Sequence, residues 1–362
     1  MTIALHRLVA YFLKLGAIGF GGPIALAGAM QRDLVEERQW LTRDDYLRGL
    51  ALAQLAPGPL AAQLAIYIGW LRAGFVGATL VGVAFVLPSL VMVLALAELY
   101  VRFASISVLI GGAFYGVGAA VIAVIARSAY KLVKMTLGRD TLLWIVFLVN
   151  AILTAVTGQE VVSVILGGGV LVMLARPRAF APAAMLLVVP PDILLQLGWF
   201  FTKAGAFVFG SGLAIVPFLY GGVVEQHHWL TDQQFLDSVA VAMITPGPVV
   251  ITVAFIGYLV AGLKGGLVAA AGVFVPCWLF TILPAPFFNR IAENARIRAF
   301  VDGVTAAATG AIAGAAIVLG RRALIDVTTI LIALTASALM MRFRKLPEPL
   351  VILAAAAVGM LL

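Results

Sequence analysis

The sequence predicts an all-α polytopic membrane protein that consists of two inverted-topology repeats. Three observations predict it: an apolar composition, an internal repeat, and opposite charge patterns in equivalent loops. Of 362 residues, 63% are hydrophobic and 11% are charged, whereas a soluble domain is about half apolar and about a quarter charged. A soluble core could not bury this many apolar side chains, so the chain is expected to lie in a lipid bilayer.

The internal repeat relates residues 14–59 to residues 203–248 at a constant offset of 189, without a gap. The two stretches share 17 of 46 positions, including a Lys, a Trp-Leu-Thr and a Pro-Gly-Pro. The offset is about half of the chain, which indicates duplication of a whole domain. We therefore predict a first repeat over 1–178, a linker over 179–195 and a second repeat over 196–362.

Apolar runs of membrane-helix length follow one another along both halves. They cover 8–30, 47–71, 75–100, 107–126, 141–157, 160–175, 196–221, 236–262, 266–288, 300–320, 323–341 and 347–362. A Pro-Gly-Pro interrupts 47–71 and 236–262, and proline removes a backbone donor and clashes with the preceding turn. We interpret these two runs as re-entrant helical hairpins, so each repeat has about five transmembrane helices and one hairpin.

Basic residues predict the orientation of the repeats, because Lys and Arg concentrate in cytoplasmic loops. The loop after the first run carries Arg32, Arg38, Arg43 and Arg48, whereas its counterpart at 222–237 has no Lys or Arg. Equivalent loops thus have opposite charge, and an odd number of crossings per repeat also requires an inverted second half. The pair Arg321-Arg322 is an exception that this scheme does not explain.

Composition also excludes several classes of function. The net charge of +8 arises from basic residues between apolar runs, which indicates topology and contact with membrane lipids and not nucleic-acid binding. The single Cys277 excludes a disulfide framework or a metal–thiolate site within one chain. No acid–base pair, metal cluster or nucleophile motif recurs inside the spans, so we predict no enzyme, no catalytic residue, no metal and no cofactor.

Four predicted breaks in the helices identify the candidate site. They lie at Gly19–Pro23, Pro57–Pro59, Gly210–Gly212 and Pro246–Pro248. Non-helical backbone inside a bilayer must be buried in protein or line a cavity, and matching breaks in inverted repeats mark the midplane site of secondary transporters. Helices that restart after a proline direct free N–H groups and positive dipole ends at the centre. Such ends bind anions, so the site favours an oxyanion over a metal cation.

The candidate substrate-binding residues surround these breaks. The backbone candidates are Gly21, Gly22, Pro57, Gly58, Pro59, Gly210, Gly212, Pro246, Gly247 and Pro248, and the polar side chains are those of Gln63, Ser211, Thr245 and Thr252. Lys14 and Lys203 occupy equivalent positions before the glycine breaks and could add positive potential. Two structural alternatives remain open: the glycines could serve only close helix packing, and the lysines could extend to the membrane interface.

The order of these motifs resembles the chromate ion transporter (CHR) family. In the first half the resemblance runs through Phe20-Gly21-Gly22-Pro23, Trp40, Pro57-Gly58-Pro59, Gln63, Gly69, Phe85 and Pro88. In the second half it runs through Phe209-Gly210-Ser211-Gly212, Trp229, Pro246-Gly247-Pro248, Phe274 and Pro276. It covers nearly the whole chain and implies the long, two-domain form. The second copy departs at Ser211-Gly212, where the first has Gly22-Pro23, which predicts an asymmetric site with an added hydroxyl donor.

The resemblance implies chromate efflux and chromate resistance in the bacterial cytoplasmic (inner) membrane, with sulfate as a chemically similar competitor. The hypothesis is alternating access, in which a tetrahedral dianion lies between the two hairpin tips and one repeat rocks against the other. A sulfate or other oxyanion importer and an anion channel that uses the same helix ends remain as alternatives. A homodimer is compatible with the sequence.

Overall fold

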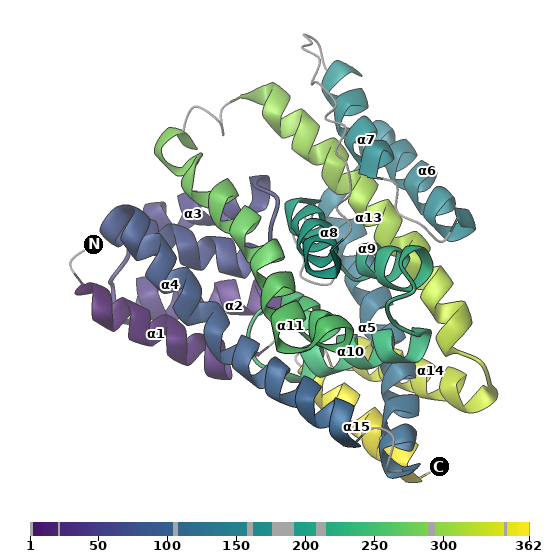
Figure 1. The fold of residues 1–362 in the computed structure, drawn as a ribbon. Helices are drawn as coiled ribbons and strands as arrows, with labels where there is room; N and C mark the ends of the chain where they lie inside the picture. The colour runs from purple at the N-terminus through teal and green to yellow at the C-terminus, as the bar shows by residue number, and fades with distance from the viewer. Residues whose placement is uncertain are drawn as a thin grey trace.

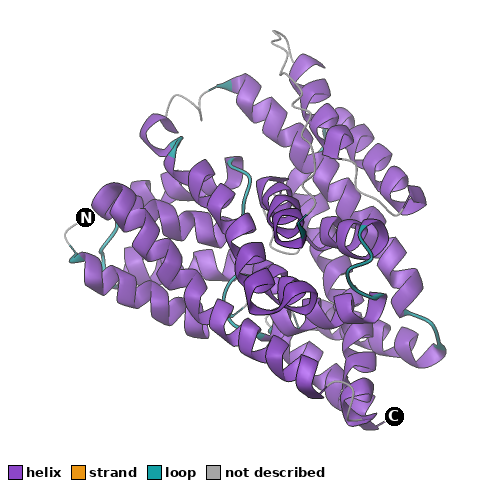
Figure 2. Ribbon diagram, viewed as in Figure 1, coloured by secondary structure: helices purple, strands orange, loops and turns teal. Residues whose placement is uncertain are grey.

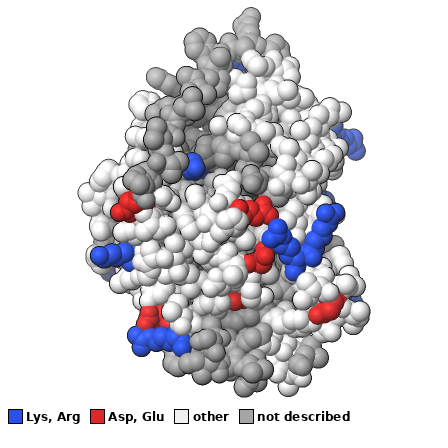
Figure 3. All heavy atoms as spheres, turned by 45° about the vertical axis from the view of Figure 1, so that its right-hand side comes forward, with Lys and Arg blue, Asp and Glu red and all other residues white. Residues whose placement is uncertain are grey.

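The structure is a computed structural model, and it describes residues 3–20, 22–103, 108–157, 162–175, 192–207, 215–288, 294–343 and 346–361. Throughout these ranges the regular secondary structure is helical, with no strand (Figure 2). Four helical stretches are long and apolar enough to cross a membrane, at Leu60–Arg102, Tyr115–Thr136, Val249–Phe287 and Ala295–Ala323, and shorter apolar helices accompany them. Charged side chains are sparse on the face in Figure 3. The prediction of an all-α, multi-pass membrane protein is confirmed.

The two halves repeat one order of elements. The first half contains α1 (Leu5–Ile18), α2 (Gly22–Met30), the π-helix η1 (Gln31–Glu37), α3 (Arg43–Leu55), α4 (Leu60–Phe103), α5 (Val108–Thr136), α6 (Thr141–Thr157) and α7 (Val162–Ala175). The second contains α8 (Ile193–Phe207), α9 (Ile215–Tyr220), the π-helix η3 (Gly221–Gln226), α10 (Asp232–Ile244), the 3₁₀ turn η4 (Val249–Ile251), α11 (Thr252–Ile282), the 3₁₀ turn η5 (Ala285–Phe287), α13 (Ala295–Ala323), α14 (Val327–Arg342) and α15 (Glu348–Leu361).

The duplication extends to the helix ends. The hydroxyl of Thr42 caps α3 by accepting from the Asp45 amide, and Thr231 caps α10 in the same way through the Gln234 amide. Each of these helices has 13 residues, a length of about 20 Å at the usual rise. This is shorter than the hydrocarbon core of a bilayer, which is about 30 Å thick.

Each short helix forms an antiparallel hairpin with the helix that follows it. A Cβ added at Gly49 in α3 would lie 2.4 Å from Cδ1 of Tyr67 in α4, so the two helices pack closely on either side of the Pro-Gly-Pro turn. The structure thus has a helical hairpin where the sequence predicts one over 47–71. The corresponding pair in the second half is α10 and the start of α11.

The long helices α4 and α11 each fold back on themselves. The reversal lies at Ala73–Gly74 in α4 and at Ala261–Gly262 in α11, where Gly74 has φ +55° and Gly262 has φ +59°. Close glycine packing joins the two arms, because a Cβ at Gly69 would lie 2.3 Å from the Gly77 carbonyl oxygen. We call residues before the reversal the first arm and those after it the second arm.

The two halves interlock. Helix α4 packs on α11, α5 packs on α14 and α15, and α13 packs on α6 and α7 (Figure 1). Each helix of these pairs comes from a different half. The packing therefore divides the protein into a tip unit, which holds α1–α4 and α8–α11 with the broken helices, and a frame unit, which holds α5–α7 and α13–α15. The largest apolar core joins α8–α11 of the tip unit to α5, α14 and α15 of the frame unit.

Candidate oxyanion site

The two Pro-Gly-Pro turns have unusual backbone conformations. Gly58 has φ +141° and Gly247 has φ +98°, values that side chains larger than hydrogen rarely allow. The residue before each turn, Ala56 in one half and Thr245 in the other, has the same extended conformation at φ −84° and ψ 141°. Each turn therefore ends one helix and restarts the next, at Leu60 of α4 or at the 3₁₀ turn η4 that leads into α11.

Three of the four predicted breaks lie together. One small cavity is lined by Pro23, Leu26, Pro59, Ala61, Gly247, Pro248, Val249 and Val250, which come from both halves. A hydrogen bond of 2.8 Å from the Gly247 amide to the Gly19 carbonyl oxygen joins the first and last of these breaks directly. The fourth break, with Gly210, Ser211 and Gly212, lies outside the described residues, as does Gly21. Gly22 begins α2, next to Pro23 of the cavity.

The cavity between the turns is closed in this structure. Its volume of about 10 Å³ suits about one water molecule, which is too little for a tetrahedral oxyanion. An anion could enter only after the surrounding helices separate.

Each Pro-Gly-Pro turn lies against the second arm of the other half. A Cβ added at Gly247 would lie 2.7 Å from Oγ of Ser89 in α4, and one at Gly58 would lie 3.3 Å from Sγ of Cys277 in α11. Ser89 and Cys277 are fully buried and are 188 residues apart in the sequence. Because the reversals at Gly74 and Gly262 are also 188 residues apart, Ser89 and Cys277 are equivalent positions, and the sequence analysis missed both. The repeat offset falls from 189 at the Pro-Gly-Pro turns to 188 in the helices that follow, so an alignment with one gap would pair the two residues.

The polar candidates next to the turns already have backbone partners. Nε2 of the fully buried Gln63 donates to the Pro57 carbonyl at 2.8 Å, and its Oε1 has no partner among the described residues. The Thr245 hydroxyl donates to carbonyls of α10, at 3.1 Å from Val241, and the Thr252 hydroxyl donates to Val249 at 2.8 Å. In this conformation the donors left for an anion are therefore backbone amides and not these hydroxyls.

The two lysines lie apart from the turns. Lys14 is exposed on α1, and Lys203 is half-buried on α8, with Nζ 5.7 Å from the centre of the Trp199 ring. Among the described residues, neither side chain makes a hydrogen bond or an ion pair with a Pro-Gly-Pro turn. The structure thus groups the two turns and Gln63 but does not bring the lysines to them.

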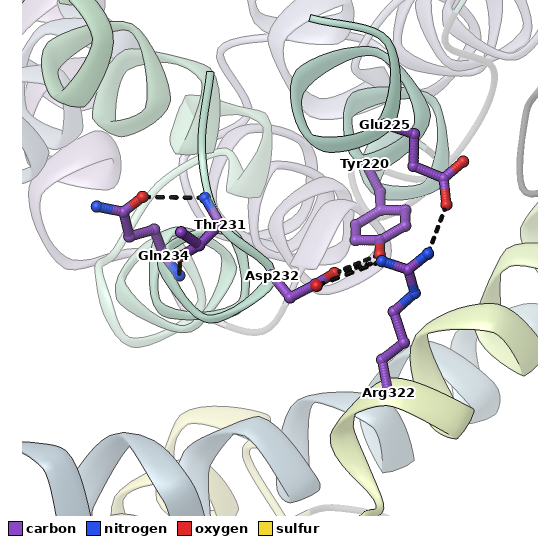
Figure 4. A network of polar contacts seen from close by, with 6 residues as sticks. All are labelled: Tyr220, Glu225, Thr231, Asp232, Gln234 and Arg322. Carbon is purple, nitrogen blue, oxygen red and sulfur yellow. Dashed lines mark hydrogen bonds and ion pairs between the residues drawn. The ribbon is translucent and has the colours of Figure 1, made fainter. Parts of the chain in front are cut away.

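A polar network at the start of α10 accounts for Arg322, one of the two residues of the Arg321-Arg322 exception. Arg322, near the end of α13, pairs with Asp232 at 2.9 Å and with Glu225 at 3.0 Å (Figure 4). The Tyr220 hydroxyl donates to the same Asp232 carboxylate, and its ring lies 5.3 Å below the guanidinium. Arg322 is thus neutralised by acidic residues of the tip unit, so it does not act as a free positive charge in the loop after α13.

Comparison with known proteins decides the family. The sequence profile described as "Chromate transporter" matches two segments of the chain, residues 6–173 and 195–360. The chain belongs to the chromate transporter family. It is 59% identical to the chromate transport protein of Cupriavidus metallidurans, over 99% of this chain and 93% of that protein.

Two further members of the chromate transporter family are similar over nearly the same length. The probable chromate transport protein of Synechococcus elongatus is 55% identical over 99% of this chain and 95% of its own. The chromate transport protein of Pseudomonas aeruginosa is 32% identical over 98% and 92%. No solved structure matches this chain. The family is one of transporters and not of enzymes.

Proposed function

We propose that this protein is a secondary transporter that exports chromate from the cytoplasm by alternating access across the bacterial inner membrane. Membership of the chromate transporter family supports chromate as the substrate. The observation that carries the proposed site is the meeting of Pro59 with Gly247 and Pro248 at one cavity, although 189 residues separate the two turns.

The proposed ligands are backbone amides of the two tips. Helices that restart after Pro59 and Pro248 have unpaired amides in their first turn and a positive dipole end. A tetrahedral dianion accepts several hydrogen bonds, and buried amides bind it more strongly than amides in water because the surroundings have a low dielectric constant. Sulfate has the same shape and charge, so we propose it as a competitor.

The packing argues against a rocking of one whole repeat against the other. Such a motion would have to separate α4 from α11, α5 from α14 and α15, and α13 from α6 and α7. All of these helices pack closely. We propose instead that the tip unit moves relative to the frame unit. The hairpins α3–α4 and α10–α11 enter the membrane from opposite sides in this scheme, which the opposite charge of their loops supports.

Transport of chromate into inverted membrane vesicles tests the proposal. We expect chromate uptake that saturates, is competed by sulfate more than by phosphate, and is accelerated by chromate already inside the vesicles. Flux that does not saturate and shows no counter-transport would identify a channel. Uptake only into vesicles of the native orientation would identify an importer. Imposing and then removing a pH gradient in the same vesicles reports proton coupling.

A further inference from the structure

Equivalent helices of the two hairpins differ sharply in burial. In α10, nine consecutive residues from Phe235 to Met243 are buried, whereas α3 buries only the face with Tyr46, Gly49, Leu52 and Ala53. The contrast is clear at one pair of equivalent leucines, because Leu47 is 47% exposed and Leu236 is 5% exposed.

Contacts with the frame unit account for this difference. Helix α10 packs against both α5 and α15, and α3 makes no comparable contact with α13 or α7 in the part of the chain that the structure describes. Gly118 of α5 lies directly over Leu236, since an added Cβ would be 3.7 Å from Cδ1 of that leucine. The exposed face of α3, which carries Leu47, Arg48 and Gln54, is therefore the face that α10 buries.

The frame unit offers α3 the same kind of partner that α10 has. Gly116 of α5 packs against the backbone of Ala355 in α15, and Gly303 of α13 packs against the backbone of Gly168 in α7. Gly116 and Gly303 are 187 residues apart, and so are Gly168 and Ala355. Helices α13 and α7 are therefore the counterparts of α5 and α15. In this register Thr305 of α13 is the counterpart of Gly118.

The Arg322 network exists on one side only. It links α13 to η3 through Glu225 and to the start of the buried helix α10 through Asp232. The first half has Arg43 at the position of Asp232 and Met135 at the position of Arg322. Its Glu36 instead accepts a hydrogen bond from Gln31 within η1. Among the described residues, no equivalent ion pair holds α3 to the frame unit.

We propose that the exposed face of α3 is an interaction surface for α13 and α7 in a second state, in which α10 separates from α5 and α15. Arg322 is the positioning residue that favours the state described here. This inference rests on the proposed alternating access. The side of the protein on which α3 is exposed is that of the loop with Arg32, Arg38 and Arg43, which the charge pattern places in the cytoplasm. The present structure is then an inward-facing state in which the anion cavity is still closed.

Two matched cysteine pairs test the proposal in the full chain, with Cys277→Ser as background and a protease site inserted in the 179–190 segment. Gly118→Cys with Leu236→Cys reports the present state, and Leu47→Cys with Thr305→Cys reports the second state. After mild oxidation in membranes and cleavage, a disulfide keeps the two fragments together. We expect both pairs to cross-link, the first to a greater extent.

The variant Arg322→Gln, with Arg322→Lys as the conservative control, shifts the balance between these pairs. We expect the ratio of second-state to present-state cross-link to rise about fivefold in Arg322→Gln, which corresponds to the loss of a partly exposed ion-pair network. The proposal is overturned if Leu47→Cys with Thr305→Cys never cross-links while the other pair does. It is also overturned if Leu47→Cys cross-links only to a second copy of the chain. If each pair cross-links in its own variant but the wild-type chain carries no chromate, the proposed substrate is rejected and the two states are not.

Discussion

The amide of Gly247 and the carbonyl oxygen of Gly19 form a hydrogen bond of 2.8 Å between the broken helices of the two halves. This contact uses one of the amides proposed to bind the anion, so that donor is already satisfied within the protein. An incoming oxyanion would have to replace the Gly19 carbonyl, which couples binding to separation of the two tips. The closed cavity of about 10 Å³ at this point is consistent with that exchange.

Gly247→Ala is expected to abolish most chromate transport. The φ of +98° is strained for alanine by about 1–3 kcal/mol, and the added Cβ would meet Ser89 Oγ at 2.7 Å. Uptake into inverted vesicles should fall at least about tenfold. The control is Gly262→Ala, which has φ +59° but no neighbour within 4 Å. Equal loss in both variants would assign the effect to backbone strain in general and not to the tip.

Gly257→Ala is expected to destabilise the hairpin of α11. Alanine normally favours a helix over glycine by up to about 1 kcal/mol, but here its Cβ would lie 2.4 Å from the Gly265 carbonyl oxygen. We expect a net loss of about 1–3 kcal/mol and a lower melting temperature in detergent. Gly167→Ala in α7 has open space around it and should be neutral or stabilising. A Gly257→Ala protein as stable as the wild type would contradict the arm–arm contact.

Cys277 is expected to report opening of the site. The thiol is fully buried beside Gly58, so a small membrane-permeable thiol reagent should reach it only when the tip unit opens. We expect slow labelling that chromate or sulfate slows further, measured by mass spectrometry of the intact protein. Cys277→Ser, which copies its equivalent Ser89, should remain unlabelled and keep transport. Fast labelling that the anions do not change would separate this cysteine from the site.

Gln63→Leu is expected to reduce both stability and transport. The amide of the fully buried Gln63 satisfies the Pro57 carbonyl at 2.8 Å, and removal of this donor leaves a half-buried acceptor unpaired at a cost of up to about 1–3 kcal/mol. The matched control is Gln54→Leu, at a position that is exposed in this structure, and it is compared by thermal unfolding alone because its face of α3 is proposed to pack on the frame unit in the second state. Thermal unfolding should separate the two variants, and identical melting temperatures would remove Gln63 from the tip.

Much of the local structure could be predicted from the sequence. The breaks at Gly19 and at both Pro-Gly-Pro turns, the hairpins on either side of Pro57–Pro59 and Pro246–Pro248, and the duplicated helix order all follow from proline, glycine and apolar periodicity. These properties act over a few residues, so they can be read from neighbouring positions. The site prediction was less complete, because Ser89 and Cys277 lie far from the turns in sequence and reach them only through the crossing of α4 and α11.

The sequence by itself determined that this chain is a helical membrane protein with an internal repeat and a helix break at each Pro-Gly-Pro turn, because composition and chain stereochemistry suffice for that, whereas the family was indicated by the resemblance of its motifs. Only the tertiary structure decided that the halves interlock, that the Arg322 charge is neutralised by Asp232 and Glu225, and that α10 is buried while α3 is exposed. The reason is physical: two nearly equivalent hairpins have similar local preferences, and their difference arises from which helices of the frame unit cover them.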